Sequence, residues 1–207
     1  LARRGHQVDL VTSPKLADIV ETNGLRPLCY ESVLEAMPVE AHQEDAPDQA
    51  AKPILSVEDN AAVVDAVEEA FGDRRPDLVA YDFASSTAGR ILARKWNVPA
   101  VQLNAVFAQN EEFAYTQSFD DNGVATGKPM TPRELASLPA FRPWADRTAA
   151  LLDQHGMGSM FDEIVDAAAE FNLVFIPKAL QPMADSFDER FAFVGPCVDD
   201  REALGRW

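Results

Sequence analysis

The stretch RRPDLVAYDFASSTAGRILARKWNVPAVQLN, residues 74–104, predicts a strand, a helix and a second strand. The apolar run 78–81 is of the kind buried in a parallel sheet, and it ends at Asp82. Small and apolar residues recur at helical spacing over 87–96, and another apolar run follows over 98–103. The stretch therefore predicts one βαβ unit.

The polar residues at the ends of these elements decide where a site could lie. Ser85 or Ser86 can cap the helix, and Asn97 closes it. Ligands of such units bind beyond the carboxyl ends of the strands, so Asp82 and Asn104 are expected to share one rim. Asp82 has a second interpretation, in which it only ends the strand or helps to cap the helix.

Two segments near the start of the chain repeat the strand, helix and strand pattern. Residues 7–12 and 25–30 predict strands, and a helix is predicted between them from Pro14 to Gly24. Two βαβ units favour a doubly wound, Rossmann-like and mostly parallel sheet. The fold class is therefore α/β.

The rest of the chain predicts a loop, three helical segments, an aromatic stretch and two short strands. The loop is rich in acidic residues and proline, and the aromatic stretch is low in charge. In chain order the segments are the loop 31–53, a helix 54–71, the aromatic stretch 105–119, helical segments 132–155 and 159–171, and strands 173–176 and 191–194.

Composition limits the class of protein. The 207 residues are 47% hydrophobic, enough for a sizeable core, and their formal charge of −16 disfavours nucleic acids and anionic membranes as partners. No membrane span or signal stretch is evident, so a cytoplasmic location is expected. Cys29 and Cys197 are too few for a disulfide framework, and Cys29 is expected in a buried strand.

Three blocks of the sequence resemble the acceptor-binding half of macrolide glycosyltransferases, and the oleandomycin glycosyltransferases in particular. The blocks follow the order and spacing of that family over nearly the whole chain. They are RRGHQVDLVTSPKLADIVETNG, RPDLVAYDFASSTAGRILARKWNVPAVQLN and NLVFIPKALQPMADSFDERFAFVGP.

The resemblance implies the N-terminal half of a two-domain GT-B enzyme, truncated at both ends. Residues 1–195 would form the acceptor-binding domain and 196–207 the start of the linker to a C-terminal donor-binding domain. The first strand, the first helix and the loop with the catalytic histidine would precede Leu1. Loss of that strand would leave an unpaired gap in the sheet.

Asp82 matches the family aspartate in the strand-end pattern DLVxxD. In the family this carboxylate orients and stabilises the histidine that takes the proton from the acceptor hydroxyl. A sugar-accepting hydroxyl is a poor nucleophile, and an imidazole is a better base when a carboxylate fixes its tautomer. His6 also follows a glycine, but it lies at a structural turn and is not expected to be the base.

The resemblance also places acceptor-binding residues in the loop and helix after the second strand. An apolar, aromatic wall suits a bulky lipophilic alcohol, and core packing is the alternative for each side chain. The candidates are Asn104, Val106, Phe107, Glu111 and Phe113, with Met37 resting on loop position alone.

The resemblance implies that the complete enzyme transfers a hexose, with inversion, from a nucleotide sugar to a hydroxyl of a macrolide or similar lipophilic natural product, and a UDP-sugar is the expected donor. No metal site and no other cofactor are expected, since no Cys and His cluster has ligand spacing. The alternatives are a noncatalytic α/β binding or partner module and an epimerase-like relative with the same fold.

Overall fold

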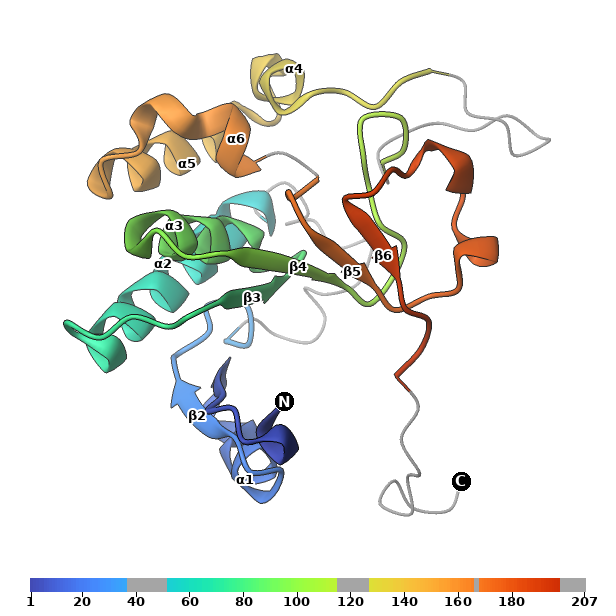
Figure 1. The fold of residues 1–207 in the computed structure, drawn as a ribbon. Helices are drawn as coiled ribbons and strands as arrows, with labels where there is room; N and C mark the ends of the chain where they lie inside the picture. The colour runs from blue at the N-terminus through green and yellow to red at the C-terminus, as the bar shows by residue number, and fades with distance from the viewer. Residues whose placement is uncertain (37–51, 115–126, 166–167, 198–207) are drawn as a thin grey trace.

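The computed structural model describes residues 1–36, 52–114, 127–165 and 168–197. Parallel strands form its sheets, as the sequence predicts, and helices cover them (Figure 1). One sheet has the order β3-β4-β5-β6, and a second pairs β1 with β2. The strands are β1 (Asp9–Thr12), β2 (Arg26–Cys29), β3 (Val79–Asp82), β4 (Ala100–Asn104), β5 (Asn172–Val174) and β6 (Phe191–Phe193).

Six α-helices and several short 3-10 helices connect the strands within the described part of the chain. The α-helices are α1 (Ala17–Thr22), α2 (Lys52–Phe71), α3 (Ser86–Trp96), α4 (Pro132–Ser137), α5 (Arg142–Gln154) and α6 (Phe161–Val165). The 3-10 helices are η1 (Ala2–Arg4), η2 (Pro14–Leu16), η5 (Gly158–Met160), η6 (Lys178–Leu180) and η7 (Ala184–Ser186).

The predicted central βαβ unit is present as β3, α3 and β4. Asn97 ends α3 in the left-handed conformation, with φ of 50°, as a C-terminal cap. Gly89 allows α3 to lie close to the sheet, because a Cβ at this position would come within 2.3 Å of the Tyr81 ring. Any larger residue at Gly89 would separate α3 from β3.

The described strands form two sheets where the sequence predicted one. Among them, β1 pairs only with β2, and β3 pairs only with β4. Both pairs are parallel, so the two βαβ units themselves are confirmed.

Two clusters of buried side chains hold the layers together. The larger joins β2, α2, α3, α5 and α6, and Val64, Ile91 and Leu152 are among its fully buried members. The smaller packs the loop after β4 against β5 and β6, with Phe113 and Phe187 among its members. Burial of such side chains is the main favourable term in folding.

Two helix predictions are wrong in extent. The predicted segment 132–155 is two helices, because Pro139 forces the preceding Leu138 into an extended conformation with ψ of 134°. In the predicted segment 159–171 the described α-helix is Phe161–Val165, and residues 168–171 are not helical. Before β5, the Asn172 side chain donates to the Ala169 carbonyl and accepts from its N–H, which replaces helical bonding there.

The predicted burial of Cys29 is also wrong. Side chains alternate along a strand, and in β2 it is Leu28 that reaches the core, which leaves Cys29 exposed. Cys197 is exposed as well, and both are free thiols. No helix within the described segments is both long and apolar enough to cross a membrane.

Candidate functional site

The carboxyl ends of β3 and β4 bring Asp82 and Asn104 to one edge of the sheet, as predicted. Asp82 is the last residue of β3 and stands opposite Leu103 in the parallel register, next to Asn104. The two side chains differ in environment: Asp82 is exposed, whereas Asn104 is only 3% exposed. A ligand on this edge could therefore reach the carboxylate directly, and the Asn104 amide only if the edge opened.

Asp82 caps the turn into α3. Its Oδ1 accepts a hydrogen bond from the Ser85 N–H over 2.9 Å, while Ser85, the N-cap residue, makes no capping bond through its own side chain. The capping interpretation of Asp82 is thus confirmed. It leaves room for catalysis, because Oδ2 takes part in none of the hydrogen bonds found within the described residues.

Asn60, in α2, holds the same turn from the other side. Its Nδ2 donates to the Ala84 carbonyl over 3.0 Å, and its Oδ1 accepts from the Ala88 N–H over 2.9 Å. The predicted cap from Ser85 or Ser86 is therefore supplied by a different helix. No local sequence pattern marks this cap, since Asn60 lies 28 residues from Ala88.

Asn104 belongs to a buried polar network under the edge. Its Oδ1 accepts from Gln102 Nε2 over 3.1 Å, and the Gln102 Oε1 accepts from Arg90 Nη2 over the same distance. Arg90 also donates to the Tyr81 hydroxyl and to the Ile164 carbonyl. Buried polar groups need such partners, so this network fixes the Asn104 amide in place.

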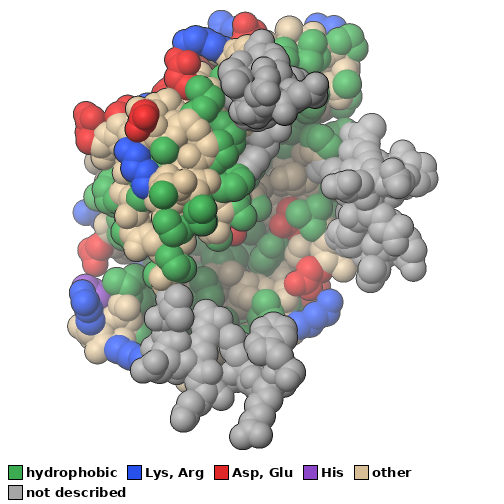
Figure 2. All heavy atoms as spheres, turned by 90° about the vertical axis from the view of Figure 1, so that its right-hand side faces the viewer, with side chains coloured by type: hydrophobic (Ala, Val, Ile, Leu, Met, Phe, Trp, Pro, Cys, Tyr) green, Lys and Arg blue, Asp and Glu red, His purple; other side chains and the backbone are tan. Residues whose placement is uncertain are grey.

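Exposed apolar side chains follow the carboxyl ends of all four strands of the larger sheet. We call this set the apolar rim: Phe83, Val106, Phe107, Leu180 and Val194. Val106, for example, is 58% exposed. The strands point toward the right in Figure 1, and Figure 2 shows hydrophobic side chains around a hollow in that face. Exposed apolar side chains gathered at one edge are typical of a ligand or partner site.

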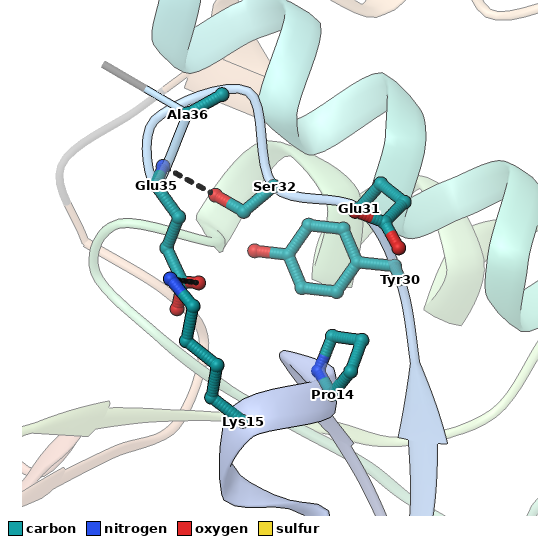
Figure 3. A pocket seen from close by; sticks show the side chains of 7 residues that line it. All are labelled: Pro14, Lys15, Tyr30, Glu31, Ser32, Glu35 and Ala36. Carbon is teal, nitrogen blue, oxygen red and sulfur yellow. Dashed lines mark hydrogen bonds and ion pairs between the residues drawn. The ribbon is translucent and has the colours of Figure 1, made fainter. Parts of the chain in front are cut away.

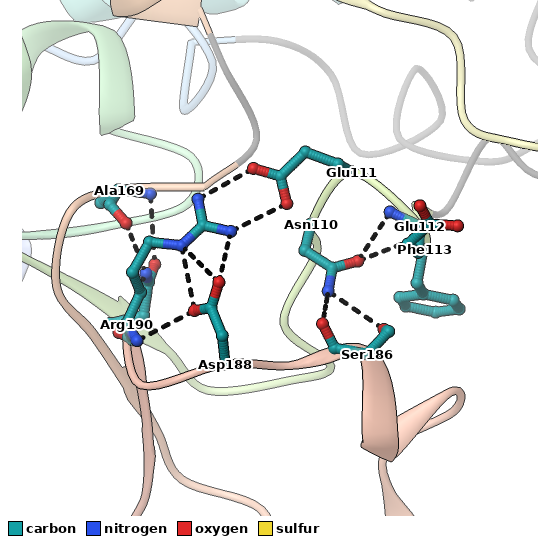
Figure 4. Close-up of polar contacts among 9 residues, drawn as sticks. Asn110, Glu111, Glu112, Phe113, Ala169, Ser186, Asp188 and Arg190 are labelled. Atoms are coloured by element: carbon teal, nitrogen blue, oxygen red, sulfur yellow. Dashed lines mark hydrogen bonds and ion pairs between the residues drawn. The ribbon is translucent and has the colours of Figure 1, made fainter.

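Glu111 does not lie on this edge. Arg190 immediately precedes β6, at the amino end of that strand, and its guanidinium binds both Glu111 oxygens over 2.8 and 2.9 Å (Figure 4). Asp188 binds the same guanidinium. The pKa of the Glu111 carboxyl is lowered, chiefly by the hydrogen bonds from Arg190. The predicted helix around Glu111 is absent, because residues 105–114 form a loop.

Phe113 lies in the smaller core. Its ring is 3% exposed, and its centroid is 6.5 Å from that of Phe187. Asn110 shapes this bend by accepting from the Phe113 N–H and donating to Ser186 (Figure 4). For Phe113 the structure supports the core-packing alternative, whereas Val106 and Phe107 remain on the exposed edge.

Gln181 clamps the loop after β4 from the connection after β5. Its side-chain amide accepts from the Ala108 N–H and donates to the Ala108 carbonyl, over 3.0 and 3.1 Å. With 4% of its surface exposed, Gln181 holds this loop from within the fold.

A cavity of about 280 Å³ lies beyond the carboxyl ends of β1 and β2. One wall is the Tyr30 ring, and the Lys15 and Glu35 ion pair closes the other side (Figure 3). The residues that line it are Pro14, Lys15, Tyr30, Glu31, Ser32, Glu35 and Ala36. Met37, a predicted acceptor contact, lies outside the described residues, and so does the tip of the loop.

Asp59, in α2, holds this wall in place. Its Oδ2 accepts from the Tyr30 hydroxyl over 2.9 Å, and its Oδ1 accepts from the Ser32 hydroxyl and the Val33 N–H over 2.7 and 2.8 Å. Burial and the bond to Asp59 raise the pKa of the Tyr30 phenol. No signal in the sequence separates Asp59 from the other acidic residues of α2. Within the described residues, no group of three or more possible metal ligands occurs.

Comparisons with known proteins find similar glycosyltransferases. No protein-family model matches the chain. The oleandomycin glycosyltransferase of Streptomyces antibioticus is 33% identical over 214 residues, which cover 100% of this chain and 45% of that protein. The crystal structure of CalG4, the calicheamicin glycosyltransferase, is also similar, with 36% sequence identity and a TM-score of 0.76. The match covers 94% of this chain and 47% of the CalG4 chain.

The chain is similar to the N-terminal half of GT-B glycosyltransferases. The NDP-glycosyltransferase YjiC of Bacillus licheniformis supports this, being 28% identical over 98% of the chain and 47% of that protein. The chain spans about half the length of the curated relatives that it matches. The predicted GT-B fold and glycosyltransferase relationship are therefore confirmed.

Proposed function

We propose that the complete protein is an inverting hexosyltransferase and that this chain forms its acceptor-binding domain. The acceptor is a macrolide or a similar lipophilic natural product, and the donor is a nucleotide sugar such as a UDP-sugar. The acceptor oxygen bonds to the anomeric carbon as the bond from that carbon to the diphosphate breaks, and the hydroxyl proton passes to a histidine. The transfer needs no metal.

The observation that carries the proposal is the composition of the carboxyl edge. An exposed carboxylate, Asp82, lies on the same edge as the apolar rim. An apolar surface favours binding of a lipophilic molecule, and the carboxylate supplies the one charge that general-base catalysis requires there. The relatives named for oleandomycin and calicheamicin transfer are consistent with that acceptor class.

Asp82 serves this reaction as the partner of the histidine. The turn that it caps holds the carboxylate at the N-terminus of α3. An ionised carboxylate orients the imidazole and stabilises the imidazolium formed when the proton arrives. The nucleotide sugar is held chiefly by a C-terminal domain that faces this edge.

The test is product formation by the complete protein with UDP-glucose as donor and oleandomycin among a panel of macrolide acceptors. Mass spectrometry should detect a glycoside one hexose heavier than the acceptor, with an inverted anomeric configuration by NMR. Failure of the complete protein to glycosylate any macrolide, with nucleotide sugars of several kinds, would contradict the proposed acceptor class.

Calorimetric titration of residues 1–207 alone gives a second test. We expect no micromolar binding of UDP-glucose, because the formal charge of −16 repels a diphosphate. A macrolide should bind measurably through the apolar rim. Tight binding of the nucleotide sugar by this chain would sink the assignment as the acceptor half.

A further inference from the structure

Two adjacent polar residues of α2 are buried between the loops of the carboxyl edge. Asp59 and Asn60 are 8% and 6% exposed. Successive residues of an α-helix point about 100° apart, so neighbours can reach two different loops. Asp59 bonds to the segment after β2, and Asn60 bonds to the turn after β3.

The Asp59 carboxylate collects four donors from residues 30–34. Besides the Tyr30 and Ser32 hydroxyls and the Val33 N–H, the Leu34 N–H lies 3.4 Å from Oδ1. A buried carboxylate is tolerated only when such bonds replace water, and bonds to an ionised acceptor are the stronger kind. The segment that forms the wall of the cavity is therefore fastened to α2 through one side chain.

Asn60 performs the matching role at the Asp82 turn. It supplies the acceptor for the Ala88 N–H, one of the first N–H groups of α3, which lack a partner within the helix. It also donates to the Ala84 carbonyl, and its own position is fixed by a bond to the Ser56 carbonyl. These Asn60 hydrogen bonds also hold Asp82, whose Oδ1 accepts from the N–H of Ser85 in the same turn.

We propose that the acceptor also contacts the cavity wall at residues 30–34, and that Asp59 and Asn60 are a pair of positioning residues that hold this wall and the carboxylate of Asp82 at a fixed separation. The inference rests on the proposed function. Asp59 holds the wall at residues 30–34 and so controls how tightly the acceptor binds. Asn60 holds the turn at residues 82–88 and so controls the alignment of Asp82 with its histidine. Because both residues lie on one helix, movement of α2 shifts both loops together.

The test compares the substitutions Asp59→Ala and Asn60→Ala in the complete protein, with UDP-glucose and oleandomycin as probes. Misplacement of a reacting group by about 1 Å can cost on the order of 100-fold in rate, so Asn60→Ala should lower kcat about 10-fold to 100-fold with KM for the acceptor within about twofold. Asp59→Ala should instead raise that KM by about tenfold, with kcat within about twofold, because loss of the wall weakens acceptor binding.

Hydrogen exchange measured by mass spectrometry tests the Asp59 and Asn60 hydrogen bonds without any transfer reaction. Asp59→Ala should speed exchange at Val33 and Leu34, whereas Asn60→Ala should speed exchange at Ala88 and leave Val33 protected. Two milder variants grade the effect. Asp59→Asn keeps one acceptor oxygen, and Asn60→Asp keeps the acceptor for Ala88 but loses the donor to Ala84, so each should give an intermediate change.

Two control substitutions on the same helix separate positioning from stability. Asp65→Ala removes an exposed carboxylate and should change neither constant. Val64→Ala opens a cavity in the core one helical turn from Asn60, so it should lower the melting temperature. It should show neither the selective fall in kcat nor the selective rise in KM. If Val64→Ala reproduces the kinetic effects at a matched loss of stability, the positioning role is wrong.

The remaining outcomes are also decisive. Unchanged exchange in both alanine variants would show that Asp59 and Asn60 do not hold the two loops. Faster exchange with unchanged kcat and KM would overturn their role in transfer. A wild-type protein that makes no glycoside would refute both the proposed function and the kinetic part of the inference. The exchange data would still decide whether Asp59 and Asn60 hold the two loops.

Discussion

The two edges of the four-stranded sheet differ in how their charges are used. At the carboxyl edge an exposed carboxylate, Asp82, stands with the apolar rim. At the amino edge a cavity of about 370 Å³ is lined by Arg90, Arg94 and Arg190, and their charges meet protein partners such as Glu163 and Glu111. Charges satisfied within the fold stabilise it, whereas a charge left accessible on an apolar edge is suited to chemistry.

The largest expected effect of a substitution is at Asp82, on the carboxyl edge. Asp82→Asn keeps an oxygen for the Ser85 N–H, so the turn should persist, but the histidine loses its charged partner. In the comparable serine-protease triad this change lowers kcat by about 10⁴, and we expect a loss of similar order in the complete protein. Steady-state kinetics with circular dichroism as a folding control measures it. Near-normal turnover would remove Asp82 from the mechanism.

The next largest effect separates Phe113 from the edge that the sequence assigned to it. The Phe113 ring is packed against Phe187 in the smaller core, so Phe113→Ala should cost about 3–5 kcal/mol of stability. Acceptor preference should change little in whatever protein remains folded. Denaturation by urea, with acceptor ranking at a temperature below the transition, measures both. A shift in ranking without loss of stability would place Phe113 in the acceptor site after all.

Phe107 is the matched opposite on the exposed edge. Phe107→Ala should raise KM for a macrolide by about tenfold, which corresponds to about 1.4 kcal/mol of lost binding. Stability should change by less than about 1 kcal/mol, because the ring is 39% exposed. Kinetics with oleandomycin and a melting curve test the pair of expectations. An unchanged KM would show that Phe107 does not contact the acceptor.

The sequence predicted the elements that local patterns determine. The βαβ unit from residue 78 to 104, the helix stop at Asn97 and the edge that carries Asp82 follow from periodicity, turn residues and parallel topology. The family relationship was likewise visible in contiguous motifs.

The positions that the sequence could not predict depend on contacts between distant residues. Glu111 and Phe113 follow Asn104 closely in sequence, but Arg190 and Phe187 draw them away from the rim. Asn60 caps a helix that begins 26 residues later, and no local pattern marks such a bond. Long-range hydrogen bonds and aromatic packing thus determine where these two residues lie, whereas Val106 and Phe107 of the same loop stay exposed.

The smallest expected effect tests the amino edge, where Glu111 should serve only stability. Arg190 lowers the pKa of Glu111, so the ionised form is favoured in the folded state. The stabilisation is therefore complete above the ordinary glutamate pKa of about 4.3 and is lost as pH falls through the lower folded value. Since Glu111 is more than half exposed, solvent screening limits the contribution of its ion pair with Arg190 to less than about 1 kcal/mol of stability.

Glu111→Gln should thus lower the free energy of unfolding slightly at neutral pH, and the difference from wild type should vanish in acid, below the folded pKa. Urea denaturation at a series of pH values measures this difference directly. Glu69→Gln, at an exposed position of α2, is the control and should show no such dependence. Transfer activity should be unchanged in Glu111→Gln, because Glu111 lies away from the carboxyl edge. A marked rise in acceptor KM would instead return Glu111 to the acceptor site and weaken the contrast between the two edges.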